Sequence, residues 1–120
     1  MTSFEIDIAE STAILESQHV AREAMLVASR KVIQLASSSI RSTHRGEHAK
    51  AKELNEQGRS LLDSCEDQMR QFPGIAANSM FYDAQKEYCE SCVTSAVLTG
   101  TQIPTRETLN VEPAAYINGI

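Results

Sequence analysis

Apolar residues recur at helical spacing along the first third of the chain. The series contains Val20, Ala21, Ala24, Met25, Ala28, Val32, Leu35, Ala36 and Ile40, and such a series indicates one buried face of an α-helix. Thr2 and Glu5 have the spacing of a capping box, and no Gly or Pro follows until Gly46. The pattern therefore predicts a helix from near Ser3 that runs about 40 residues, or roughly 60 Å, with Glu10–Thr12 as the place where it could break.

Breaking residues divide the next part of the chain into two more long helices. Gly46 has the position of a helix C-cap, so a second helix is expected over Glu47–Gln71, before a stop at Phe72-Pro73-Gly74. A third helix is expected from about Ile75 to Thr99, ahead of Gly100. Its apolar stripe contains Phe81, Tyr88, Cys92 and Ala96.

The C-terminal segment predicts short elements. Thr101–Glu112 has the composition of a connector, with a single turn over Arg106–Leu109. Pro113 suits the first position of a further helix, which has barely begun when the chain ends at Ile120. A helix of that length has little stability alone. We therefore expect either that it docks on the other helices or that the chain is shorter than the fold to which it belongs.

The amino-acid composition is consistent with a helical domain. With 120 residues, 42% of them hydrophobic, the chain is expected to form one all-α domain over residues 1–120, built from long antiparallel helices. Cys65, Cys89 and Cys92 make an odd number of cysteines, which favours reduced thiols in a cytoplasmic protein over a disulfide framework. No apolar run approaches the ~20 residues that cross a membrane. The Cys89-x-x-Cys92 spacing lies inside a helix without a second pair, so we interpret both thiols as core side chains rather than metal ligands.

The charge is unevenly distributed. The net charge of −5 does not by itself suggest a partner such as nucleic acid. The segment from Arg30 to Lys52, however, contains six Lys and Arg residues and one acid, Glu47, so its net charge is +5. Arg41 and Arg45 are one helical turn apart and could contact phosphates. The alternative is an ordinary helix end, whose cations complement the helix dipole.

Three carboxylates form a stripe on the third predicted helix. Glu87 and Glu90 are three residues apart, and Asp83 precedes Glu87 by four, so all three project from one face. A hard cation such as Mg²⁺ takes oxygen ligands, often one or two carboxylates together with water. The alternative is a solvated acidic face on which Lys86 pairs with Glu90 and Asp83.

Several of these segments resemble the translin family, above all its Trax (translin-associated factor X) branch. The first helix contributes Arg22-Glu23, Ser29-Arg30 and His44-Arg45. Gln85-Lys86-Glu87-Tyr88-Cys89-Glu90-Ser91 is similar to the Trax pattern Q-E-Y-V-E-A, with one residue inserted or substituted at Lys86. Pro113-Ala114-Ala115-Tyr116-Ile117-Asn118-Gly119-Ile120 is similar to the family's P-x-x-Y-L-x-G-hydrophobic segment. The resemblance spans about residues 20–120.

This resemblance implies a translin-like helical bundle and a hollow oligomer that encloses single-stranded RNA or DNA, formed from copies of the chain or with a second translin-family subunit. In the Trax branch it implies Mg²⁺-dependent endoribonuclease activity, with Glu87 and Glu90 as catalytic residues and metal ligands. Arg41, Arg45, Arg30 and Lys86 would then hold the nucleic-acid backbone.

One departure leaves a second function open. Family members continue past the Tyr-x-x-Gly motif, and a further catalytic carboxylate follows it, whereas this chain ends at Ile120. The fold is therefore expected to be truncated after the start of a fourth or fifth helix. The alternative function is a non-catalytic nucleic-acid-binding or assembly protein of the same family.

Overall fold

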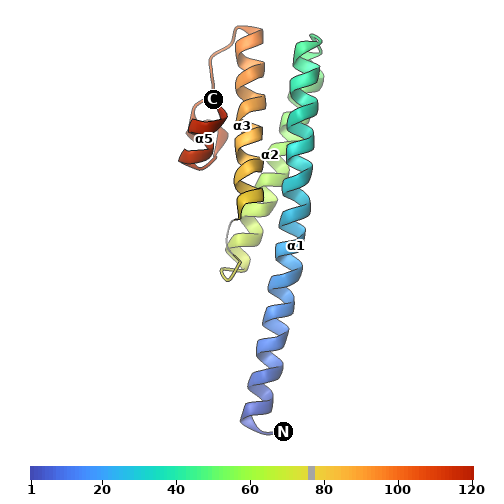
Figure 1. The fold of residues 1–120 in the computed structure, drawn as a ribbon, viewed down its shortest axis with the longest axis vertical. Helices are drawn as coiled ribbons and strands as arrows, with labels where there is room; N and C mark the ends of the chain where they lie inside the picture. Colours follow the sequence, from blue (N-terminus) through green and yellow to red (C-terminus); the bar gives the residue numbers. More distant parts are fainter. Residues whose placement is uncertain (76–77) are drawn as a thin grey trace.

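Three long helices, with successive helices antiparallel, carry most of the chain (Figure 1). The structure is a computed structural model that describes residues 1–75 and 78–120, and these residues contain no β-strand. The helices are α1 (Ser3–His44), α2 (His48–Gln71), α3 (Ser79–Thr99), α4 (Arg106–Leu109) and α5 (Pro113–Gly119). The all-α prediction is therefore confirmed.

The first helix is a single continuous element. Thr2 Oγ1 accepts a hydrogen bond from the Glu5 amide at 3.1 Å, and the Thr2 amide donates to the Glu5 carboxylate at 3.4 Å. This is the capping box that the sequence predicts. No break occurs at Glu10–Thr12, because the surrounding Ala, Leu and Glu residues are good helix formers. Gly46 follows the helix with a positive φ of 78°.

The third helix begins later than predicted. Asn78 caps it by accepting a hydrogen bond from the Phe81 amide at 3.0 Å, so the helix starts at Ser79 rather than at Ile75. Ile75 is instead buried ahead of the helix. The two residues at positions 76 and 77, which the sequence assigns to the helix, lie outside the described residues. An Asn side chain that satisfies an open helix amide favours the cap position over the helix interior.

The core lies where the three long helices meet. Its centre contains apolar side chains from each of them and from the segment after α3: Met25, Val32, Leu62, Cys65, Phe81, Ala84, Tyr88, Cys89, Leu109 and Val111. Small polar residues on α1 let α2 approach closely, and the Ser39 hydroxyl donates to the Ala51 carbonyl at 3.2 Å. Gly58 on α2 faces Tyr88 of α3, and a Cβ there would be in ordinary van der Waals contact with the Tyr88 ring at 3.5 Å.

The first half of α1 extends beyond the bundle (Figure 1). We call residues 3–20 the arm. Almost every side chain of the arm is exposed, including Phe4 at 73% and Leu15 at 65%. Neither α2 nor α3 reaches the N-terminal end of the molecule, which is 67 Å long. The arm is thus a helix whose larger apolar side chains are mostly exposed, and only its end near Ala13–Val20 lines a hollow with the end of α2.

The short last helix docks on α3, as its length requires. Gly119 allows the approach: a Cβ at this position would lie 2.7 Å from the Lys86 carbonyl oxygen and 2.9 Å from Cys89 Cβ. The Tyr116 hydroxyl donates to the Pro104 carbonyl at 2.9 Å, which ties α5 back to the connector. Tyr116 and Gly119 of the Tyr-x-x-Gly motif therefore have structural roles in holding α5 against α3.

None of the helices over residues 1–75 and 78–120 combines the length with the hydropathy of a membrane span.

Candidate metal and nucleic-acid site

Two carboxylates, Glu87 and Glu90, share one turn of α3. Glu87 is half-buried and Glu90 is exposed. Burial raises the pKa of Glu87, and the neighbouring Glu90 raises it further through its charge and a side-chain hydrogen bond. Lys86 opposes this shift, and Asp83 adds a small contribution in the same direction. The two carboxyl groups are therefore neighbours on one turn of α3 and act on each other electrostatically.

The pair is not neutralised by a neighbouring cation. Among the described residues, neither Glu87 nor Glu90 takes part in an ion pair, and Lys86 does not form one with Glu90 or Asp83. A carboxylate pair of this kind fits the ligand preference of Mg²⁺, which is often held by one or two carboxylates and completes its shell with water or phosphate. The same described residues bring no third His, Cys, Asp or Glu close enough to complete a ligand cluster.

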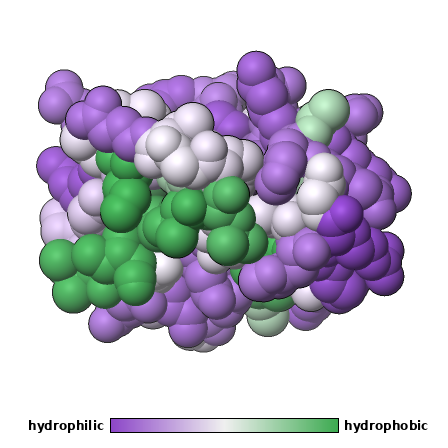
Figure 2. All heavy atoms as spheres, turned by 90° about the horizontal axis from the view of Figure 1, so that it is seen from above, coloured by the Kyte–Doolittle hydropathy of each residue, from purple (hydrophilic) through white to green (hydrophobic). Residues whose placement is uncertain are grey.

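A hollow of about 370 Å³ lies beside Glu90. It is lined by residues from the end of α1, from α3 and from the end of α5: His44, Glu90, Val93, Thr94, Val97, Leu98, Gly119 and Ile120. Seen from above, strongly apolar residues gather on one side of the molecule, and most of the remaining surface in this view is hydrophilic or intermediate (Figure 2). Val97 and Ile120 contribute exposed apolar surface, at 57% and 60% exposed. The hollow thus places an imidazole and apolar side chains next to a carboxylate.

The predicted basic residues are divided between two places. Lys86 lies next to Glu87 on α3, and its charge acts on that carboxylate. Arg30, Arg41 and Arg45 are exposed on α1, and no ion pair joins them to the carboxylate pair within the described part of the chain. The guanidinium of Arg41 donates to the hydroxyls of Ser37 and Ser38 at 2.9 and 3.1 Å.

The sequence alone did not single out Arg59, which makes more side-chain contacts than any other cation among the described residues. Its guanidinium donates to Asp63 and Glu66, to the carbonyl of Leu109 and, at 3.1 Å, to the carbonyl of Asn110. It also lies 5.4 Å from the centroid of the Tyr88 ring. The i, i+4 and i, i+7 spacing to the two acids was visible in the sequence, but the carbonyl partners come from residues about 50 positions away.

The cysteines pack as the sequence predicts. Cys65 and Cys89 are buried, and Cys92 is half-buried. Burial, together with the neighbouring Cys92 and Glu90, raises the pKa of Cys89 to about 11. Its thiol donates to the Tyr116 carbonyl at 3.8 Å. The Cys89 thiol is therefore protonated at neutral pH and acts as a packing group between α3 and α5.

Comparison with known proteins places the fold. No family model matches the chain, and no curated protein does. A crystal structure of apo-NeC3PO superposes with a TM-score of 0.74 at 19% sequence identity. The match covers 99% of this chain and 61% of that one, so the chain spans less than two thirds of the length of NeC3PO. The likeness shows that the chain has the all-α translin/C3PO fold.

Proposed function

We propose that this chain binds single-stranded RNA or DNA as part of a translin-type assembly, and that it belongs to the Trax-like branch and cleaves RNA with Mg²⁺. The observation that carries the proposal is the pair of adjacent carboxylates, Glu87 and Glu90, which have no ion-pair partner among the described residues. The likeness to NeC3PO supports the proposal at the level of the fold.

The candidate site residues would have different roles in binding and cleavage. Glu87 and Glu90 would hold Mg²⁺, which supplies charge stabilisation at a phosphate oxygen and a more acidic water when it is bound. Lys86, next to Glu87, would attract the nucleic-acid backbone. His44 lines the hollow at Glu90 and would sit beside the nucleotide whose phosphate is attacked. Arg30, Arg41 and Arg45 would contact phosphates further along the strand without reading sequence.

The central test is the substitution Glu87→Gln. Losing one of two metal ligands should slow Mg²⁺-dependent cleavage of a labelled single-stranded RNA by about 100-fold or more. RNA affinity should be unchanged or higher, because the substitution removes a negative charge from the binding surface. The matched control is Asp83→Asn, which neutralises the third acid of the same stripe and should retain most of the activity. Cleavage by Glu87→Gln at the wild-type rate would refute the assignment.

A second candidate is a nucleic-acid-binding or assembly protein without catalysis. The described residues contain no cluster of three metal-ligating side chains, and this observation favours the second candidate. It predicts RNA binding that weakens linearly on a log–log plot against salt, with no cleavage in Mg²⁺ by protein freed of contaminating nucleases. Cleavage that disappears with Glu87→Gln would eliminate it.

A further inference from the structure

A hollow of about 630 Å³ lies between α2, α3 and the connector that follows α3. We call it the rear pocket. Its lining includes Lys52, Asn55 and Arg59 of α2 together with Tyr88 and Cys92 of α3. Because Lys52 and Arg59 are seven positions apart, the pocket extends about 10 Å along α2. Small-molecule sites commonly have volumes of about 300–1,000 Å³, so the rear pocket is large enough to hold a small ligand.

The rear pocket faces away from the carboxylate pair. Cys92 follows Glu90 by two positions on α3, so the two side chains point about 200° apart around the helix axis. Cys92 lines the rear pocket, whereas Glu90 lines the hollow beside His44. A ligand in the rear pocket therefore leaves the proposed metal site unoccupied.

One side of the rear pocket is apolar and is held in place by Arg59. The apolar side contains Tyr88, Cys92, Ala96 and Leu109, and three of these residues are buried. The guanidinium of Arg59 lies 5.4 Å from the centroid of the Tyr88 ring and donates to the Leu109 carbonyl. This side of the pocket is preformed, and a flat ring system can pack on it.

Polar groups surround the apolar side. The Asn55 side-chain oxygen accepts a hydrogen bond from the Ser91 hydroxyl at 2.8 Å. The NH₂ group of Asn55 has no partner among the described residues and remains a donor. Thr99 and Thr101 add hydroxyls from the C-terminal end of α3 and just beyond it. Amide and hydroxyl groups of this kind suit the hydroxyls of a sugar or the edge of a base.

The charged side chains of the pocket favour an anion. Lys52 and Arg59 line it together with one acid, Glu56. Arg59 is already paired with acids on α2, whereas Lys52 is exposed and forms no ion pair among the described residues. Lys52 also belongs to the segment whose net charge is +5. Lys52 is therefore available to a ligand, and a lysine ammonium is a common partner of phosphate.

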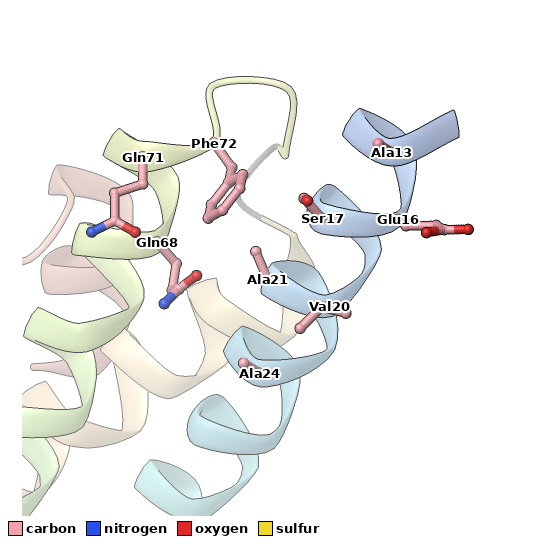
Figure 3. A pocket seen from close by; sticks show the side chains of 9 residues that line it. All are labelled: Ala13, Glu16, Ser17, Val20, Ala21, Ala24, Gln68, Gln71 and Phe72. Atoms are coloured by element: carbon pink, nitrogen blue, oxygen red, sulfur yellow. The ribbon is translucent and has the colours of Figure 1, made fainter. Parts of the chain in front are cut away.

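The hollow at the arm lacks this combination of groups. It has a volume of about 570 Å³ and lies between α1 and the end of α2. Figure 3 shows Phe72 of α2 across this hollow from Ser17 and Ala21 of α1. Among the described residues that line it, the charged one is the acid Glu16. It offers an anion no cation, so the rear pocket is the better fit for a phosphorylated ligand.

We propose that the rear pocket binds a nucleoside monophosphate. The base packs against Tyr88 and Cys92, the Asn55 amide and the neighbouring hydroxyls bind the sugar or the base edge, and the Lys52 ammonium pairs with the phosphate. A nucleoside alone leaves Lys52 without a partner, and a sugar phosphate leaves the apolar side uncovered. A nucleotide satisfies both parts of the pocket. This binding site is separate from the proposed metal and nucleic-acid site.

Calorimetric titration of the full chain with AMP and with UMP, in a buffer containing EDTA, tests the proposal. Each nucleotide should bind about tenfold more tightly than its nucleoside or than ribose 5-phosphate, because each of these lacks one set of contacts. Lys52→Met should weaken nucleotide binding about tenfold and leave nucleoside binding unchanged. The matched control is Lys50→Met, which removes an exposed lysine of α2 outside the pocket lining and should bind nucleotide as the wild type does.

Alkylation of Cys92 locates the ligand on the wild-type chain, so no substitution can disturb the fold. Cys92 is half-buried at the pocket, whereas Cys65 and Cys89 are buried. At a nucleotide concentration about ten times the Kd, roughly nine-tenths of the pockets are occupied. The reaction of Cys92 with iodoacetamide should therefore slow about tenfold, and tandem mass spectrometry assigns the modified thiol.

Four results would overturn the proposal: neither nucleotide binds at millimolar concentration, nucleotide and nucleoside bind equally, Lys52→Met and Lys50→Met behave alike, or bound nucleotide leaves Cys92 as reactive as before. Glu87→Gln should bind nucleotide normally, and loss of binding in this variant would place the nucleotide at the carboxylate pair instead. These measurements need neither Mg²⁺ nor RNA cleavage, so the rear-pocket proposal can fail while the proposed function stands, and the reverse.

Discussion

Two neighbouring helices differ in how their charged side chains are paired. The guanidinium of Arg59 on α2 has several partners within the protein, whereas Glu87 and Glu90 on α3 form no ion pair among the described residues. At Arg59 the fold supplies several partners: two acids on α2, the carbonyls of Leu109 and Asn110 at the end of α4, and the Tyr88 ring. At Glu87 and Glu90 the fold supplies a second negative charge instead, and the pKa of Glu87 rises in response to burial and to Glu90. Charge that is satisfied inside the protein stabilises it, whereas charge left without a counter-ion is available to a ligand.

The largest effect is expected from Arg59→Met. It would leave the Leu109 carbonyl without its donor and the half-buried Glu66 without its counter-ion, at a cost of about 2–4 kcal/mol. Urea unfolding measures this loss. Arg70→Met is the control, because it removes only an exposed ion pair with Asp67 and should change stability by less than about 0.5 kcal/mol. If both substitutions lowered the free energy of unfolding equally, the contacts of Arg59 would stabilise the protein no more than an exposed ion pair does.

A smaller effect is expected from Gly119→Ala, which tests whether α5 supports the helix that presents the carboxylate pair. The added Cβ would lie 2.7 Å from the Lys86 carbonyl oxygen, and overpacking of this kind costs about 1–3 kcal/mol. Amide exchange over residues 113–119 should accelerate while that of α2 changes little. The control, Ile117→Ala, changes a side chain on α5 that is 66% exposed and should leave exchange as it is.

The smallest effect is expected from Glu87→Gln without metal. The folded-state pKa of Glu87 is raised, so its contribution to stability is full below the ordinary glutamate pKa of about 4.3 and is lost as the pH rises through the folded value. The substitution should therefore stabilise the protein near pH 7, by less than about 1 kcal/mol because Glu87 is only half-buried and Glu90 is exposed. The gain should vanish towards pH 4.

Adding Mg²⁺ to the same stability measurement tests whether the cation binds at Glu87. Mg²⁺ that binds the pair should raise the melting temperature of the wild type by mass action and leave that of Glu87→Gln unchanged. Glu53→Gln, an exposed acid on α2, should respond to Mg²⁺ as the wild type does. A Mg²⁺ response that persists in Glu87→Gln would place the cation elsewhere.

Much of the fold could be predicted because its signals are local. The Thr2–Glu5 capping box, the stop after Gln71 and the turn at Gly100 each involve only a few neighbouring residues. The start of α3 was predicted wrongly. Ile75 and the capping residue Asn78 are only three positions apart, and the sequence does not show at which of them the helix begins. The spacing of Glu87 and Glu90 also identified the carboxylate pair, since side chains three apart on a helix always share a face.

The sequence by itself determined the all-α class, most of the helix ends and the carboxylate pair, because all of these depend on neighbours within a few turns. Only the tertiary structure decided what surrounds them. It brought the Leu109 carbonyl to Arg59, set Gly119 against Lys86, placed His44 at the hollow beside Glu90, and left the large apolar side chains of the arm exposed. Such contacts join residues far apart in the chain, and no local pattern encodes which helix faces will meet.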